Sequence, residues 1–137
     1  MVERTATARW SGDLRDGEGT MAFGSGAFEG AYTYASRFEQ GEGTNPEELI
    51  GAAHAGCFSM KLAGDLADAG YEPDSVETEA TVTLEGGEIV ESHLETAVEA
   101  PDVSEAEFRE VAEGAKENCP VSKALAAIDV TLDAELR

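Results

Sequence analysis

Residues 43–58 read GTNPEELIGAAHAGCF, and this stretch predicts the long helix around which the chain is organised. Asn45 is a favourable N-cap, Pro46 suits the first helical position, and the two glutamates that follow favour the positive end of the helix dipole. The helix is expected to run to Ala69 and to end at Gly70. The chain therefore contains one predicted helix of more than twenty residues.

Small residues dominate the first half of this helix. Residues 51–56 read GAAHAG, and a glycine in a helix interior costs roughly 1 kcal/mol relative to alanine. The presence of two glycines in this stretch indicates that another backbone approaches the helix closely. We therefore expect a central, buried helix, and a symmetric pair of such helices from two copies of the chain is one arrangement that would cover it.

The remaining pattern predicts strands before and after this helix, with turns at glycine pairs and two further helices. The predicted elements are an antiparallel N-terminal sheet from residues 3–10 and 18–36, a hairpin from 78–84 and 89–100 around Gly86-Gly87, a capped helix from Ser104, a short helix over 120–127 and a closing strand over 128–136. We expect a single α+β domain over residues 1–137.

The composition is strongly acidic, with 29 acidic against 9 basic residues and a net charge of −20. The acids are dispersed, which suggests a solvated acidic surface such as proteins in cytosols of very high salt carry, and a halophilic source. The charge disfavours nucleic acid as a partner. No apolar run approaches the length of a membrane span, and the opening MVER does not begin a secretion signal, so a cytoplasmic protein is expected.

Two cysteines are present, Cys57 in the long helix and Cys119 before Pro120. In a cytosolic chain such a pair indicates redox or metal chemistry, or plain burial, more than a permanent disulfide. A thiol at a helix N-terminus faces unpaired N–H groups that favour the thiolate, and this applies to Cys119. The simpler interpretations are a small core residue for Cys57 and an exposed cap for Cys119.

Arg37 and Glu47 are candidate partners of these thiols, although each could equally be an ordinary surface residue. A guanidinium stays charged and can hold a thiolate or a peroxide oxygen. Glu47 lies about 80° from Cys57 around the helix and Glu48 about 180°, but ten residues rise about 15 Å. If Glu47 serves Cys57, either the helix is broken or a second copy supplies the glutamate.

His54 lies one turn before Cys57, which admits three interpretations: a cysteine–histidine nucleophile, a metal pair or a packing residue. A zinc site needs four ligands, and beyond these two only His93 and Cys119 are classical ones, at no recognisable spacing. The sequence therefore predicts no metal and no cofactor.

Taken together, these motifs closely resemble the OsmC/Ohr family of thiol peroxidases, over essentially the whole chain. The residues that carry the resemblance are Arg37-Phe38-Glu39, GTNPEELIGAAHAGCFSM at 43–60, Cys119-Pro120-Val121-Ser122, and Trp10-Ser11-Gly12-Asp13 with Gly17-Glu18-Gly19. A histidine at position 54 resembles the OsmC branch, since the Ohr branch usually has an aromatic residue there.

The resemblance implies an intertwined homodimer in which long central helices are wrapped by antiparallel sheets, with active sites at the subunit interface. It implies reduction of organic hydroperoxides to alcohols, with Cys57 as the peroxidatic cysteine and Cys119 as the resolving one that forms a disulfide with it. Arg37 and Glu47 are implied as polar partners that orient one another. A dithiol, for which a lipoyl type is one candidate, is implied as the reductant.

Two other functions stay open at this point. A non-enzymatic dimeric stress or binding protein could use the same fold, and a cysteine hydrolase would not require Cys119. The apolar neighbours of the motifs could form walls that prefer alkyl hydroperoxides, or could be plain core; they are Phe38, Leu49, Ile50 and Phe58.

Overall fold

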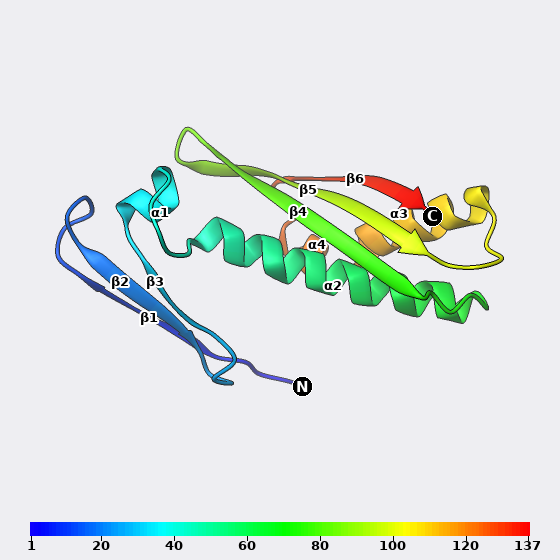
Figure 1. The fold of residues 1–137 in the computed structure, drawn as a ribbon, viewed down its shortest axis with the longest axis horizontal. Helices are drawn as coiled ribbons and strands as arrows, with labels where there is room; N and C mark the ends of the chain where they lie inside the picture. Colours follow the sequence, from blue (N-terminus) through cyan, green and yellow to red (C-terminus); the bar gives the residue numbers. More distant parts are fainter. The chain divides into compact units, whose positions relative to one another are not determined.

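The computed structural model describes residues 1–137 and divides into two units, residues 1–49 and 50–137. Helices and strands both contribute, which confirms the predicted α+β class (Figure 1). In chain order the elements are β1 (Ala6–Ser11), β2 (Glu18–Phe23), β3 (Glu29–Tyr32), α1 (Tyr34–Phe38), α2 (Pro46–Asp68), β4 (Ser75–Glu85), β5 (Glu88–Glu99), α3 (Glu105–Asn118), α4 (Pro120–Ala124) and β6 (Asp129–Leu136).

The first unit contains the antiparallel sheet β1-β2-β3. The prediction of strand as far as residue 36 is wrong, because the chain turns into α1 after Tyr32. The cause is a capping box: the Ser36 N–H donates to Thr33 Oγ1 at 3.1 Å, and the Thr33 N–H donates to Ser36 Oγ at 2.8 Å. These bonds satisfy backbone groups that a strand would have paired with a neighbour.

The long helix is confirmed as α2, which ends one residue before the predicted Ala69. Asn45 caps its start, since its side-chain oxygen accepts the N–H of Glu48 at 2.7 Å. Gly70 ends it with a φ of +99°, a left-handed conformation that glycine adopts without strain. No helix in the structure combines the length and apolar character that crossing a membrane requires.

The second unit contains the sheet β4-β5-β6, in which β4 and β5 form the predicted antiparallel hairpin. Gly86 and Gly87 turn it with φ values of +61° and +81°, as a tight hairpin turn requires. The expectation of antiparallel pairing throughout is not met, because β6 runs parallel to β5. The chain reaches β6 through α3 and α4, and a crossover of that length returns it in the same direction.

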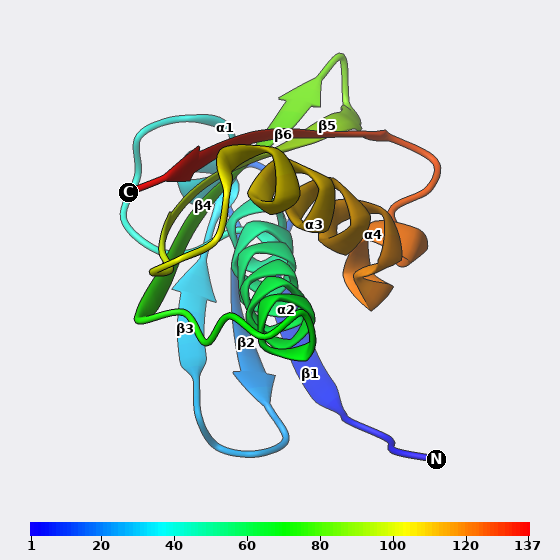
Figure 2. The ribbon, with the colours of Figure 1, turned by 90° about the vertical axis from the view of Figure 1, so that its right-hand side faces the viewer.

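The core of the second unit lies between its sheet and the two long helices, which Figure 2 shows on the same face of the sheet. Every fourth residue of α2 enters it, and alternate residues of β5 meet them, as the periods of helix and strand require. The fully buried apolar side chains on these elements and α3 are Phe58, Leu62, Leu66, Leu94, Val98, Phe108, Ala112 and Ala115. Both cysteines adjoin this cluster.

The expectation of a buried α2 is met on one side only. Gly51 is buried, and a Cβ there would lie 3.4 Å from the carbonyl oxygen of Ala80 on β4, which is the close backbone approach that its size predicts. Ala52, Gly56 and Met60 are exposed, and Met60 keeps 80% of its surface in solvent. The second unit therefore leaves this stripe of α2 uncovered.

Salt should stabilise this protein. Glu47 is the one acidic residue that is buried, so the other acids lie at or near the surface, where they repel one another. We expect the unfolding temperature to rise by roughly 5 °C or more between about 0.1 M and 2 M KCl, because screening weakens that repulsion. Thermal melts monitored by circular dichroism measure it, and an equal unfolding temperature at both salt concentrations would contradict it.

Candidate active site

The two cysteine sulfurs lie 3.0 Å apart, although 62 residues separate them in sequence. Cys57 projects from α2 and is partly exposed, whereas Cys119 is fully buried where α3 ends and α4 begins. Both are free thiols. The predicted proximity of the two thiols is confirmed, and the interpretation of Cys119 as an exposed cap is wrong.

The environments of the two thiols push their pKa values apart. Burial raises the pKa of Cys57, its hydrogen bond with Cys119 raises it further, and the N–H of Val121 offsets part of this. Burial also works against the Cys119 thiolate, but hydrogen bonds from Cys57, Ser122 and Val121 outweigh it and lower the pKa of Cys119. With only these contacts considered, Cys119 therefore loses its proton more readily than Cys57.

Arg37 and Glu47 form a two-pronged ion pair within the first unit. Arg37 Nε donates to Glu47 Oε1 at 3.0 Å and Nη2 donates to Oε2 at 2.9 Å. This bond to Glu47 raises the pKa of the arginine, which stays charged. Glu48 instead accepts the hydroxyl of Thr44 at 2.9 Å. The predicted pairing of Glu47 with Arg37 is confirmed, and the choice of Glu47 over Glu48 as a partner of Cys57 stays a prediction.

The helix that carries Glu47 and Cys57 is continuous from Pro46 to Asp68. Ten residues of unbroken α-helix place the two side chains about 15 Å apart along the axis. The alternative of a broken helix is therefore wrong.

His54 is fully buried between two serines. Its Nδ1 lies 2.6 Å from Ser92 Oγ on β5, and its Nε2 lies 2.8 Å from Ser122 Oγ on α4. Burial lowers the pKa of the imidazole, so it is neutral at pH 7. Both ring nitrogens are occupied by serines, which leaves none to act as a base toward Cys57. Sequence reasoning named Ser122 only as part of the Cys119 motif and did not name Ser92. It paired neither serine with His54, because the three residues come from separate elements and follow no recognisable spacing.

An apolar cleft of about 330 Å³ adjoins Arg37 in the first unit, and Phe38 forms part of its wall as expected. Its other lining residues are Trp10, Gly12, Leu14, Tyr32, Thr33 and Tyr34. Phe58 is fully buried in the core of the second unit and is plain core. Sequence reasoning considered Phe38 as a wall residue but recognised Tyr32 and Tyr34 only as strand formers, because their convergence depends on how β1, β2 and β3 pair and on the turn into α1.

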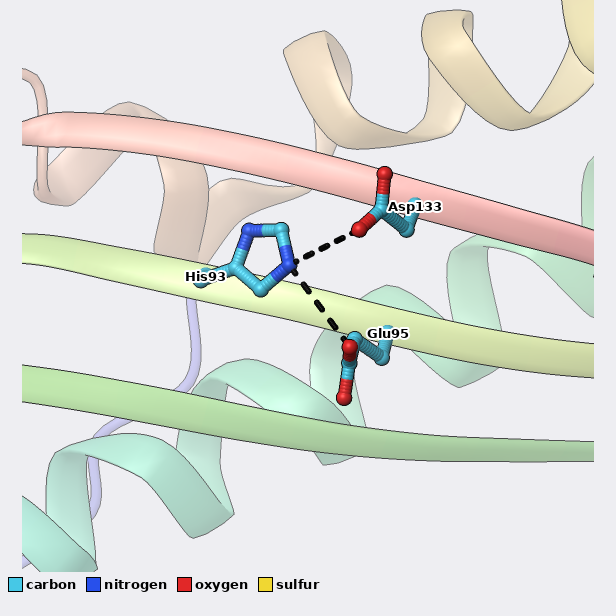
Figure 3. A group of neighbouring side chains, drawn as sticks. All are labelled: His93, Glu95 and Asp133. Carbon is cyan, nitrogen blue, oxygen red and sulfur yellow. Dashed lines mark ion pairs between the residues drawn. The ribbon is translucent and has the colours of Figure 1, made fainter.

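A third group of polar side chains lies on the sheet of the second unit (Figure 3). His93 Nε2 lies 3.2 Å from Asp133 Oδ2 and 4.0 Å from Glu95 Oε1, and the three could supply ligands to a divalent cation. Sequence reasoning missed the group because the parallel register, which pairs Glu95 with Asp133, brings it together. The side chains of Glu95 and Asp133 are exposed, as in an ordinary surface ion pair.

Comparison with known proteins places these features in a family. Residues 39–133 match the family described as OsmC-like protein. Peroxiredoxin OsmC of Escherichia coli (strain K12) is 41% identical, over 99% of this chain and 98% of that protein.

Solved structures share the fold. An OsmC like protein from Mycoplasma pneumoniae superimposes with a TM-score of 0.76 at 15% identity, covering 98% of this chain and 97% of that one. The organic hydroperoxide resistance protein OhrB of Bacillus subtilis gives 0.65 at 24% identity, covering 97% and 98%. With its two adjacent thiols and its near-full-length similarity to these proteins, the chain belongs to the OsmC-like protein family.

Proposed function

We propose that this protein is a thiol peroxidase that reduces organic hydroperoxides to alcohols, with Cys57 as the peroxidatic and Cys119 as the resolving cysteine. The 3.0 Å between the two sulfurs carries the proposal, because oxidation of one thiol would place it within reach of the other. The relative named Peroxiredoxin OsmC and the structure titled as an organic hydroperoxide resistance protein support the same activity.

In the proposed cycle the Cys57 thiolate attacks the distal oxygen of the hydroperoxide. The O–O bond breaks, the alkoxide takes a proton and leaves as an alcohol, and Cys57 becomes a sulfenic acid. The sulfur of Cys119 then attacks Cys57, which forms a disulfide and releases water. An external dithiol reduces the disulfide by exchange. Cys57 is assigned the first step because it is partly exposed, whereas Cys119 is fully buried.

The first step requires the negative charge on Cys57, although burial raises the pKa of that thiol. A nearby cation would reverse this preference, and Arg37 is the proposed source. Glu47 holds the guanidinium by two bonds, so the cation is fixed in orientation. Its charge would stabilise both the thiolate and the departing alkoxide.

We propose that a second copy of the chain supplies this ion pair, in a homodimer. Two observations support it: α2 is unbroken, so Glu47 and Cys57 of one helix are separated by about 15 Å, and a stripe of α2 that includes Gly56 and Met60 is exposed. Small residues allow two helices to approach closely, and a two-fold axis would give each copy the other's arginine.

The apolar cleft beside Arg37 is the proposed binding site for the organic part of the hydroperoxide. Tyr32, Tyr34 and Phe38 supply aromatic surface, and the cleft volume of about 330 Å³ suits a small alkyl or aryl group. Burying that group would favour an organic hydroperoxide over hydrogen peroxide, which has no apolar part to bury.

The proposed reductant is a dithiol, with a lipoyl-type dithiol as the first candidate, and the proposed compartment is the cytoplasm. A cycle that ends in a disulfide needs a reducing environment to restore both thiols. The net charge of −20 favours a reductant whose docking surface is not itself strongly acidic.

Removal of the Arg37 charge should slow the peroxide step. We expect Arg37→Ala to lower the rate at which Cys57 reacts with cumene hydroperoxide by roughly 100-fold, because a preorganised cation is lost. Stopped-flow measurement of that reaction gives the rate. Arg109→Ala is the matched control, since Arg109 forms an exposed ion pair with Glu105 on α3. An unchanged rate in Arg37→Ala would leave this arginine with a structural role.

The function itself is tested by counting free thiols before and after one equivalent of cumene hydroperoxide. A peroxidase loses two thiols per chain and forms one alcohol, and added dihydrolipoamide restores both thiols. A non-enzymatic binding protein on the same fold would keep both thiols. A cysteine hydrolase would keep its activity when Cys119 is replaced.

A further inference from the structure

Three buried side chains form a hydrogen-bonded row across the second unit. Ser92 of β5 contacts one nitrogen of His54 at 2.6 Å, and Ser122 of α4 contacts the other at 2.8 Å. His54 and Ser92 have no exposed surface, and Ser122 keeps 8% of its own. The imidazole of α2 thus joins the central strand of the sheet to the short helix that follows Cys119.

The row continues to the sulfur atoms. Ser122 lies three residues after Cys119, on the short helix α4 that begins there, and its hydroxyl and backbone N–H are among the groups that lower the pKa of the Cys119 thiol. Cys119 in turn lies 3.0 Å from Cys57. A chain of contacts therefore leads from Ser92 through His54 and Ser122 to the two thiols.

The protons in this row allow only two arrangements. A hydroxyl has one proton to donate, and a neutral imidazole has one N–H and one acceptor nitrogen. If Ser92 donates to Nδ1, then His54 Nε2–H donates to Ser122, and the Ser122 hydroxyl is free to donate to a Cys119 thiolate. In the reverse arrangement Ser122 donates to His54, and its oxygen can only accept from a Cys119 thiol. The tautomer of His54 is thereby coupled to the protonation state of Cys119.

We propose that His54 is a positioning residue for Cys119, and that through Ser122 it sets the rate at which the oxidised Cys57 is resolved. The inference rests on the proposed function. In that step the Cys119 sulfur attacks the Cys57 sulfenic acid, the S–O bond breaks, and the leaving hydroxide takes the proton that Cys119 gives up. The disulfide and one water are the products, and His54 neither gains nor loses a net proton.

A packing role alone does not account for this residue. An imidazole buried in an apolar core leaves two polar atoms to be satisfied, at a cost that a leucine of similar size avoids. Here both nitrogens are paired, and one partner, Ser122, lies on the same short helix turn as the reacting Cys119. A row that is fully satisfied holds α4 and its serine in one orientation relative to α2.

The test separates the two chemical steps in single-turnover experiments with one equivalent of cumene hydroperoxide. We expect Ser122→Ala and His54→Phe to slow disulfide formation by roughly tenfold or more. The first variant loses a hydroxyl that can donate to the Cys119 thiolate, and the second loses the hydrogen bond that orients this hydroxyl. The Cys57 sulfenic acid should then accumulate and be trapped by dimedone. His54→Gln, whose amide can still donate to Ser122, should restore part of the rate.

Ser59→Ala is the matched control. It removes a serine hydroxyl of α2 that donates to Thr78 at 2.8 Å and is not hydrogen-bonded to the row, and the variant should form the disulfide at the rate of the unaltered protein. Disulfide formation at the unaltered rate in folded Ser122→Ala and His54→Phe would overturn the inference. An equal slowing of both steps would also overturn it, since that is the effect of a general structural role. If the unaltered protein itself loses no thiols to the hydroperoxide, it is the proposed function that fails.

A measurement on the unaltered protein does not depend on any variant folding. The ¹⁵N shifts of the His54 ring should report a neutral imidazole that changes from the Nδ1–H to the Nε2–H tautomer as Cys119 loses its proton. His93→Gln assigns the signals, because the chain has two histidines. A tautomer that stays the same across the Cys119 titration would overturn the coupling.

Few other charges face His54 in that titration. Glu91 and His93 adjoin Ser92 on β5, but alternate residues of a strand point to the opposite face of the sheet. The strand neighbours of Ser92 are valines, and Lys123 of α4 is exposed. The two cysteines are therefore the titrating groups closest to the row.

Discussion

Replacing Cys57 with serine abolishes the consumption of organic hydroperoxide. A serine hydroxyl stays protonated at neutral pH and is a much weaker nucleophile than a thiolate, so the rate should fall by roughly 1,000-fold or more. Cys57 has the exposed surface that an approaching peroxide requires, whereas Cys119 has none. Loss of cumene hydroperoxide in the presence of excess dithiol measures the rate.

Cys119 is the alternative nucleophile, because its hydrogen bonds lower its pKa. If Cys57→Ser still consumes one equivalent of peroxide and Cys119 is recovered as the sulfenic acid, the two roles are reversed. Serine replaces cysteine at a half-buried position without a change of shape, so the variant is expected to fold. Circular dichroism checks that it does.

Replacing Cys119 with serine should leave the first turnover intact and prevent the following ones. Cys57 can still attack the hydroperoxide, so one alcohol per chain is expected in a rapid first phase. No thiol is then within 3.0 Å of the oxidised sulfur, and Cys57 remains as sulfenic acid or is oxidised further. Steady-state turnover with a dithiol should fall by roughly 100-fold or more, since resolution would then depend on an external thiol.

Rapid quenching followed by mass spectrometry distinguishes the two stages, because the sulfenic acid and its dimedone adduct each have a distinct mass. The combined variant Cys57→Ser with Cys119→Ser is the control and should form no alcohol. Equal residual steady-state activity in the two single variants would contradict the division of labour between the cysteines.

Local sequence determined the elements. The cap and proline at Asn45 and Pro46 set the start of α2, and Gly70 set its end, because these effects act over one turn of helix. The β4–β5 hairpin was predicted from alternating side chains and a glycine pair, which are also local features of the sequence. The error at α1 arose from a capping box between Thr33 and Ser36, which outweighed the strand preference of the aromatic residues around it.

The motifs also determined which residues belong to the candidate site. Cys57, Cys119, Arg37 and Glu47 could all be named from the sequence, and helix geometry selected Glu47 over Glu48. The structure then placed the first two 3.0 Å apart and paired the other two.

Tertiary structure alone decided the environment of the sulfurs. His54, Ser92 and Ser122 lie on three elements and meet only because the sheet and α4 pack against α2. The parallel direction of β6, which brings Asp133 to His93, depends on the crossover through α3 and α4. Contacts between distant segments depend on how whole faces pack together, and no local pattern in the chain encodes that packing.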